Sequence, residues 1–303
     1  MKTQRWSALA VLAALMPSGT SIDAAGEGQP PQLTPLDEVV VYAIDGDAYE
    51  LVRYTFETDA YIRIGVITDQ NGNVVTDIEG LAMVPQGPFR GLYGTANFYG
   101  VLPARLVKIS PLDATAHLYS AGIGFNNVEG LVATKDPVTS AWSLIGATPS
   151  PGLITIDPET GAGSVLMATE ERYRGLSLDP DGTLYGIAED ELYTIDRITG
   201  EEDEVEDLTD DARYGALEHA FGDFEPRIKV PSGGGQNVVP DSWTEDGIMF
   251  AFNVSGNRLQ IVNPNNGSLV NWSCSLQDID CEGLAFTTKL RDSYEGIVGA
   301  AFD

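Results

Sequence analysis

The chain has 303 residues, of which 43% are hydrophobic, and this is enough for one large all-β domain. Its 45 acidic residues outnumber its 17 basic residues and give a formal net charge of −28. Such a charge excludes nucleic acid and anionic membranes as main partners, because both are bound through cationic side chains. The sequence has no run of about 18 consecutive apolar residues, so we predict no membrane-spanning helix.

The first 25 residues are typical of a secretory signal peptide. Lys2 and Arg5 precede the apolar run WSALAVLAALM, and small residues follow near a cleavage point after Ala24 or Ala25. Cleavage after Ala25 would leave a net charge near −29. We therefore expect a secreted or periplasmic protein, with a Pro-rich leader at 26–35 and one folded domain at 36–303.

Short apolar phrases recur through the domain with a period of about 45 residues. The phrase DIEGLAM at 77–83 returns as NVEGLVA at 127–133, YRGLSL at 173–178 and DCEGLAF at 280–286. The phrases before DCEGLAF are each followed by a second, a third and a looser fourth β-type run, with turn sequences such as DPDG, PETG and PNNG between them. Four short strands per repeat predict the blades of a β-propeller.

The count of repeats favours five blades, with six possible. The N-terminal part supplies the second, third and fourth strands of one blade, and CEGLAF supplies its first strand, so strands from both ends of the domain should close the ring. The segment GIVGAAFD at 296–303 also resembles a second strand. A surplus of residues at 222–243, rich in Pro and Gly, is predicted to be a loop insertion.

Oxygen-bearing side chains are expected to gather at one mouth of the channel. The starts of the first strands align at Glu79, Glu129, Arg174, Glu218 and Glu282. The second strands end on the same face, with Asp45, Asn97, Thr148, Glu189 and Asn253. Because the first strand of every blade lines the channel, the two sets should converge.

Two interpretations of these residues stay open. Clustered carboxylates repel one another unless they are protonated, hydrogen-bonded or neutralised by a cation. Ca²⁺ prefers such oxygen ligands, so it could be held by a subset of Glu79, Glu129, Glu282, Asp45, Asn97, Asn253, Glu189 and Glu218. Alternatively, each glutamate accepts hydrogen bonds from the tight turn before "GL", and Arg174 balances the nearest charges.

The EGL strands resemble those of secreted, calcium-bearing six-bladed propellers. They are similar to strands of the gluconolactonase and SMP-30-like lactonases, where a glutamate before glycine is a metal ligand, and to the EGLA-type strands of the esterase-like phytases. This resemblance implies that Glu79 or Glu282 binds calcium, with Asn97, Asn253 and Asp45 as companions.

Cys274 and Cys281 are the two cysteines of the chain. Their proximity in an exported protein predicts a local disulfide, and two buried thiols are the alternative. A disulfide here would join the fourth strand of one blade to the first strand of the closing blade.

For function, we expect a secreted, non-enzymatic propeller that binds a small molecule, a glycan or an extracellular protein. The alternative is a calcium-dependent hydrolase that acts on a lactone or phosphoester at the channel mouth. Such an enzyme needs a general base, and His219 is the candidate for that role, although a structural role is the simpler interpretation.

Overall fold

The computed structural model describes residues 39–55, 60–97, 103–136, 138–150, 152–179, 181–208, 213–220, 248–255, 258–272 and 281–288, all within the compact unit Leu33–Asp303. The described residues form strands and turns and contain no helix. Accordingly, none of them belongs to a helix that could cross a membrane. The predicted signal peptide, leader, loop insertion and 296–303 segment lie outside the described residues.

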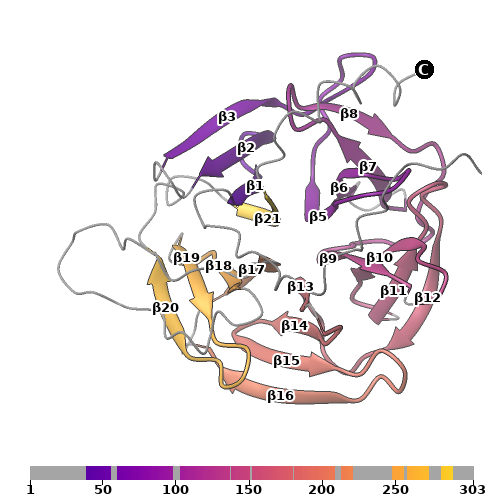
Figure 1. Cartoon of the computed structure of the whole chain (residues 1–303). Coiled ribbons are helices and arrows are strands. Elements are labelled where there is room, and N and C mark those ends of the chain that lie inside the picture. The colour runs from indigo at the N-terminus through magenta and orange to yellow at the C-terminus, as the bar shows by residue number, and fades with distance from the viewer. Residues whose placement is uncertain are drawn as a thin grey trace, which may run out of the picture. The chain divides into compact units, whose positions relative to one another are not determined.

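Five antiparallel sheets stand side by side in a ring (Figure 1), which confirms the predicted five-bladed β-propeller. Blade 1 contains β5 (Ile78–Val84), β6 (Gly91–Ala96), β7 (Arg105–Ile109) and β8 (Thr115–Leu118). Blade 2 contains β9 (Leu131–Lys135), β10 (Trp142–Ala147), β11 (Gly152–Ile156) and β12 (Gly163–Ala168). Blade 3 contains β13 (Gly175–Leu178), β14 (Leu184–Ala188), β15 (Glu191–Ile195) and β16 (Glu202–Asp207). Blade 4 contains β17 (Tyr214–Ala220), β18 (Ile248–Asn253), β19 (Arg258–Val262) and β20 (Leu269–Trp272).

The fifth sheet, the closing blade, joins segments from opposite ends of the described chain. Its strands are β21 (Cys281–Thr288), β1 (Val39–Asp45), β2 (Glu50–Thr55) and β3 (Ala60–Val66), in that order from the channel outward. β1 and β21 are antiparallel, with Val41 opposite Phe286 and Tyr42 opposite Ala285. This pairing confirms the predicted closure. A short strand that was not predicted, β4 (Thr68–Asp69), adds parallel to β8 at the outer edge of blade 1.

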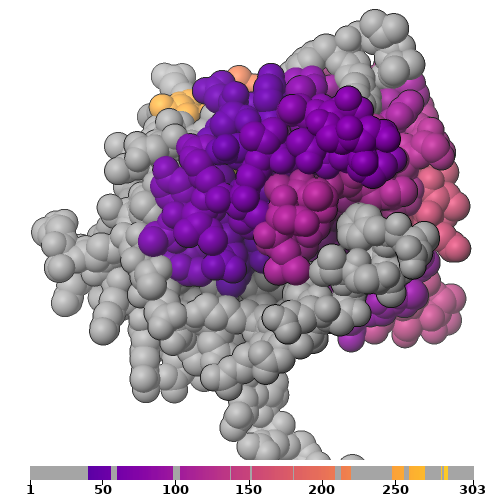
Figure 2. All heavy atoms as spheres, turned by 90° about the horizontal axis from the view of Figure 1, so that it is seen from above, coloured from indigo at the N-terminus to yellow at the C-terminus, as the bar shows by residue number. Residues whose placement is uncertain are grey.

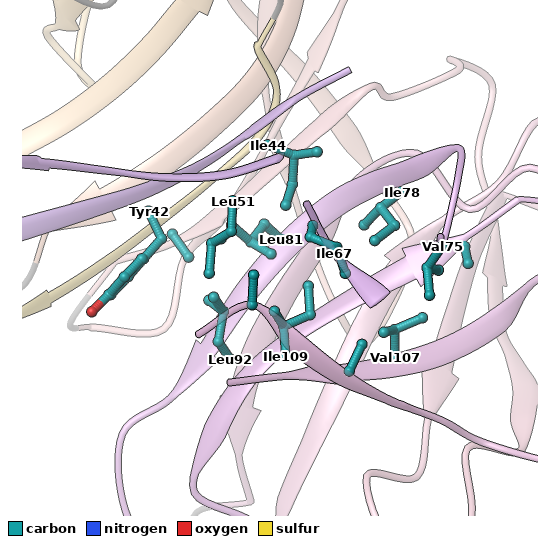
Figure 3. Packing of buried hydrophobic residues seen from close by; sticks show 14 of the residues in the cluster. Tyr42, Ile44, Leu51, Ile67, Val75, Ile78, Leu81, Leu92, Val107 and Ile109 are labelled. Carbon is teal, nitrogen blue, oxygen red and sulfur yellow. The ribbon is translucent and has the colours of Figure 1, made fainter. Parts of the chain in front are cut away.

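The hydrophobic core consists of five clusters, and each cluster lies between two adjacent blades. β1 shows why the strands are apolar throughout: Val41 and Ala43 face blade 4, whereas Tyr42 and Ile44 face blade 1. Successive side chains of a strand point to opposite faces, so a strand between two neighbours must be apolar at consecutive positions. Figure 3 shows the cluster between the closing blade and blade 1, and the space-filling view shows these two blades as one continuous surface (Figure 2).

A ring of glycines surrounds the central channel, one near the start of each first strand. These residues are Gly80, Gly130, Gly175, Gly215 and Gly283. A Cβ atom at any of them would meet the first strand of the next blade. At Gly80 this Cβ would lie 2.6 Å from the Glu129 carbonyl oxygen, and at Gly175 it would lie 2.5 Å from the Leu217 amide nitrogen. The glycine of the repeated motif is therefore required by the close approach of neighbouring inner strands.

Candidate functional site

The residues before the ring glycines gather at one mouth of the channel, as predicted, but only some are acidic. Glu79, Glu129 and Arg174 line a cavity of about 180 Å³ at this mouth. Its remaining lining residues are Arg213, Gly215, Val254 and Cys281. The described lining of this cavity therefore contains two carboxylates and two guanidinium groups, whereas the sequence predicted a ring of glutamates with Arg174 as its one basic member.

Glu79 is held by the end of the second strand of its own blade. The Asn97 side chain donates from Nδ2 to Oε2 of Glu79 at 2.9 Å and to the Val128 carbonyl at 3.1 Å, and its Oδ1 accepts from the Val128 amide at 3.0 Å. Burial is the main reason why the pKa of Glu79 rises to about 7, and the neighbouring charge of Glu129 adds to it. Asn97 thus joins blade 1 to the start of blade 2 and orients Glu79.

Glu129 has a cationic partner that the sequence did not reveal. The Arg172 guanidinium reaches both of its carboxylate oxygens, with Nε 3.2 Å from Oε2 and a closer contact between Nη2 and Oε1. Arg174 contacts the exposed Glu189 at 3.1 Å. A sequence signal was present in the repeated Arg-Tyr pairs of ERYRGL and ARYGAL, which bring arginines to the strand starts of blades 3 and 4.

Three further predicted ligands are engaged elsewhere. Buried Asp45 accepts a hydrogen bond from Arg63 at 2.6 Å, and Asn253 donates to Gln260 at 3.4 Å. Glu189 lies on the exposed rim beside Arg174. The structure brings Glu79, Glu129 and Asn97 together, but it does not bring Asp45, Asn253 or Glu189 into contact with them through any described hydrogen bond.

Glu218 is not equivalent to the other glutamates, and its predicted alignment is wrong. Tyr214 is the residue before the ring glycine Gly215, and its hydroxyl donates to Gln260 at 2.8 Å. Glu218 lies farther along β17, paired with Phe250, and is buried. The equivalent position in every blade is marked by the glycine that packs against the next blade, and not by the glutamate before it.

His219 follows Glu218 and lies toward the end of the ring opposite the mouth. It is 4% exposed, and burial lowers its pKa to about 4. A base at the mouth would need to reach a substrate beside Glu79 and Glu129, and the position of His219 near the far end of β17 does not meet this requirement.

A calcium ion at the mouth stays a prediction. Arg172 already supplies positive charge to Glu129, and Arg174 and Arg213 line the same cavity. Coulomb repulsion from these guanidiniums opposes a divalent cation there. The side chain of Glu282 and the whole of Cys274 lie outside the described residues, so the predicted disulfide is also untested; Cys281 is buried, with Sγ 3.4 Å from the Gly283 carbonyl oxygen.

The charges at the mouth predict opposite effects of two substitutions on Glu79. Glu129→Gln should lower the pKa of Glu79 below about 7, because a nearby negative charge is removed. Arg172→Gln should raise it, because a nearby positive charge is lost. Carboxyl ¹³C NMR titration measures both, with Glu159→Gln on an outer hairpin as the control. Shifts of the same sign in the two variants would contradict this arrangement.

A separate group of carboxylates lies on the outer strands of blade 3. Ligand oxygens of Glu191, Glu204 and Asp207 are within 4.8 Å of one another and could hold a metal ion. No sequence repeat pointed to this group, because Glu191 and Asp207 become neighbours only through the pairing of β15 with β16.

A second, larger concave surface lies at the other end of the ring, between blades 2 and 3. This groove has a volume of about 880 Å³ and includes the ends of β9 and β15 and the start of β14. Its charged lining residues are Asp136, Asp181, Asp196, Asp203, Lys135 and Arg197. Arg197 crosses between the blades and donates to Thr134 at 3.0 Å.

Exposed hydrophobic residues stand on the two hairpins that border this groove. Val138, in the β9–β10 hairpin, is 89% exposed, and Ile198, in the β15–β16 hairpin, is 94% exposed. The preceding aspartates fix both turns: Asp136 accepts from the amides of 138 and 139, and Asp196 from those of 198 and 199. These hydrogen bonds lower the pKa of both carboxyl groups, so both are ionised at neutral pH.

The fold and its channel define a β-propeller. The chain is similar to a propeller chain in the crystal structure of a nidogen/laminin complex, with a TM-score of 0.52 and 14% identity over 85% of this chain and 83% of that chain. No protein-family model matches the sequence, and no curated protein matches it. The likeness shows the fold, and the resemblance to lactonases and phytases gains no support from it.

Proposed function

We propose that this chain is a secreted, non-enzymatic binding propeller that takes a protein partner in the groove between blades 2 and 3. The observation that carries the proposal is the pair of exposed hydrophobic residues, Val138 and Ile198, on the hairpins beside a large groove. A well-formed turn holds each of these hydrophobic side chains in water. Covering such a side chain with a partner removes apolar surface from water, which favours binding.

The charge of the groove indicates the kind of partner. Four aspartates and two basic residues line it, and Arg197 already donates to Thr134. The surplus of negative charge lies on a strongly acidic chain. A segment that carries Lys or Arg together with apolar side chains would be complementary to both features. The nidogen/laminin propeller comes from a protein complex, which supports a protein as the partner.

Charge-neutral substitutions test this groove. Asp136→Asn and Asp196→Asn keep the side-chain oxygen that accepts from the turn amides, so the hairpins should persist while two negative charges are lost. The probe is an unstructured peptide of alternating Arg and Val, measured by fluorescence anisotropy. We expect the double variant to bind it about tenfold more weakly, and salt to weaken wild-type binding.

The matched control is Asp157→Asn, which changes the same type of turn in the β11–β12 hairpin, outside the groove lining. It should bind the peptide as the wild type does. Ile198→Ser should weaken binding without changing its salt dependence, because it removes apolar contact only. Equal binding of an alternating Glu and Val peptide, or an unchanged affinity in the double variant, would refute the proposal.

A further inference from the structure

The cavity at the channel mouth has a charge pattern that fits neither a simple cation nor a simple anion. Glu129 contributes a negative group, Glu79 contributes a second one at a pH above its pKa of about 7, and Arg174 and Arg213 contribute positive groups. The other described residues of its lining are Gly215, Val254 and Cys281. A divalent cation would meet two guanidiniums, and an anion would meet two carboxylates.

The positive groups have unused hydrogen-bonding capacity. Arg174 is largely buried, with a side chain 17% exposed, and its Nε has no hydrogen-bond partner among the described residues. Its Nη2 reaches the exposed Glu189. The guanidinium of Arg213 makes no ion pair with any other residue that the structure describes. A carboxylate is the group that guanidiniums bind best, through paired N–H···O contacts.

The negative groups are fixed from outside the cavity. Asn97 orients Glu79, and Arg172 orients Glu129. Oxygens of the two side chains can accept from an ammonium group that enters the cavity, because a carboxylate has about four lone-pair sites. The site thus offers fixed acceptors as well as free donors.

The size of the cavity limits its ligand. Its volume of about 180 Å³ is below the roughly 300–1,000 Å³ of typical small-molecule sites, so a drug-sized substrate or a sugar chain does not fit. Gly215 has no side chain, and Val254 supplies one apolar wall. A compact ligand with two opposite charges and a small apolar part matches these dimensions.

We propose that the channel-mouth cavity binds a small zwitterion of amino-acid size, with its carboxylate on Arg174 and Arg213 and its ammonium on Glu79 and Glu129. This site is separate from the groove between blades 2 and 3, and the two proposals stand independently. The chemistry is that of a free α-amino acid, which carries both charges a short distance apart.

The test titrates the intact mature protein with glycine and L-alanine, followed by NMR chemical shifts of residues at the mouth. Propionate and ethylamine each carry one of the two charged groups, and Ca²⁺ tests the cation alone. We expect saturable binding of a zwitterion and binding of each single-charge analogue that is at least about tenfold weaker, because the unmatched half of the site stays unpaired.

Two arginine variants localise the site. Arg174→Gln and the more exposed Arg213→Gln should each weaken zwitterion binding by about tenfold or more, whereas Arg105→Gln on blade 1 should not. If Arg174→Gln does not fold, the binding of the zwitterion by Arg213→Gln decides the test. Each variant is used only if its NMR spectrum shows the native fold. The proposal is overturned if propionate binds as well as alanine, if Ca²⁺ binds and displaces alanine, if millimolar glycine and alanine shift no mouth resonance, or if both arginine variants bind like the wild type.

Discussion

Replacing Gly80 by alanine is expected to lower the free energy of unfolding by about 3 kcal/mol. A Cβ atom at Gly80 would lie 2.6 Å from the Glu129 carbonyl oxygen and 3.0 Å from Cβ of Leu131. Backbone atoms of the next blade cannot move aside cheaply, so overpacking costs about 1–3 kcal/mol. The φ of +59° adds roughly 1–2 kcal/mol for any residue with a side chain.

Gly72→Ala separates the two contributions. Gly72 has a φ of +81° in an exposed turn, and no atom lies within 4 Å of the position of its Cβ. This variant should lose only about 1–2 kcal/mol, because it has the backbone strain without the close contact. Chemical denaturation with a common m-value gives both numbers. If Gly80→Ala cost no more than Gly72→Ala, the inner strands would not be in tight contact around the channel.

The second large effect concerns acid. We expect the protein to lose about 3 kcal/mol of stability as the pH falls from 6.5 to 4, through His219 alone. Its folded pKa of about 4 is below the ordinary histidine value of 6.5, because burial disfavours the charged imidazole. Because the pKa is lower in the folded protein, this contribution to stability is complete above pH 6.5. It is lost as the pH falls through the folded pKa of about 4. His219→Gln should flatten this acid limb in pH-dependent denaturation.

Glu218 acts in the opposite direction. Burial raises its pKa well above the usual value, and its Oε2 has no hydrogen-bond partner in the described part of the chain. A raised pKa gives stability that is complete below 4.5 and lost as the pH rises. Glu218→Gln should therefore be more stable than the wild type at pH 8 and no more stable at pH 4. Glu206→Gln, on an exposed outer strand, is the control and should differ little at either pH. A stability curve unaffected by both His219→Gln and Glu218→Gln would show that neither group titrates in the folded core.

The fold followed from the sequence because the strands of a propeller repeat their local rules. Alternating apolar runs and Asp- or Asn-initiated turns predicted four strands for each blade, and the missing first strand of the closing blade predicted its pairing with β21. The strand β4 was missed because it has two residues, too few for any period to be visible.

The site was predicted less well because side-chain partners depend on neighbouring blades. Arg172 and Arg213 precede their strands, and their direction cannot be obtained from strand alternation. Arg63 on β3 contacts Asp45 at the end of β1, and β2 lies between these two strands. Glu218 does not occupy the predicted position because the feature that every blade shares is the glycine contact with the next blade, and not the carboxylate before it.

Ring closure by β21 has a consequence for the order of synthesis. Blades 1 to 4 are made of consecutive strands, so each can assemble from hairpins soon after its residues emerge. The closing blade cannot, because Asp45 pairs with Cys281 and β1 must wait for a strand made long afterwards. During that interval β1 presents an unpaired inner edge and two apolar faces, the surfaces that invite association between nascent chains. The step most exposed to association is thus the arrival of β21, and a chain stalled before β21 is made should be captured with blades 1 to 4 formed and the inner edge of β1 still unpaired.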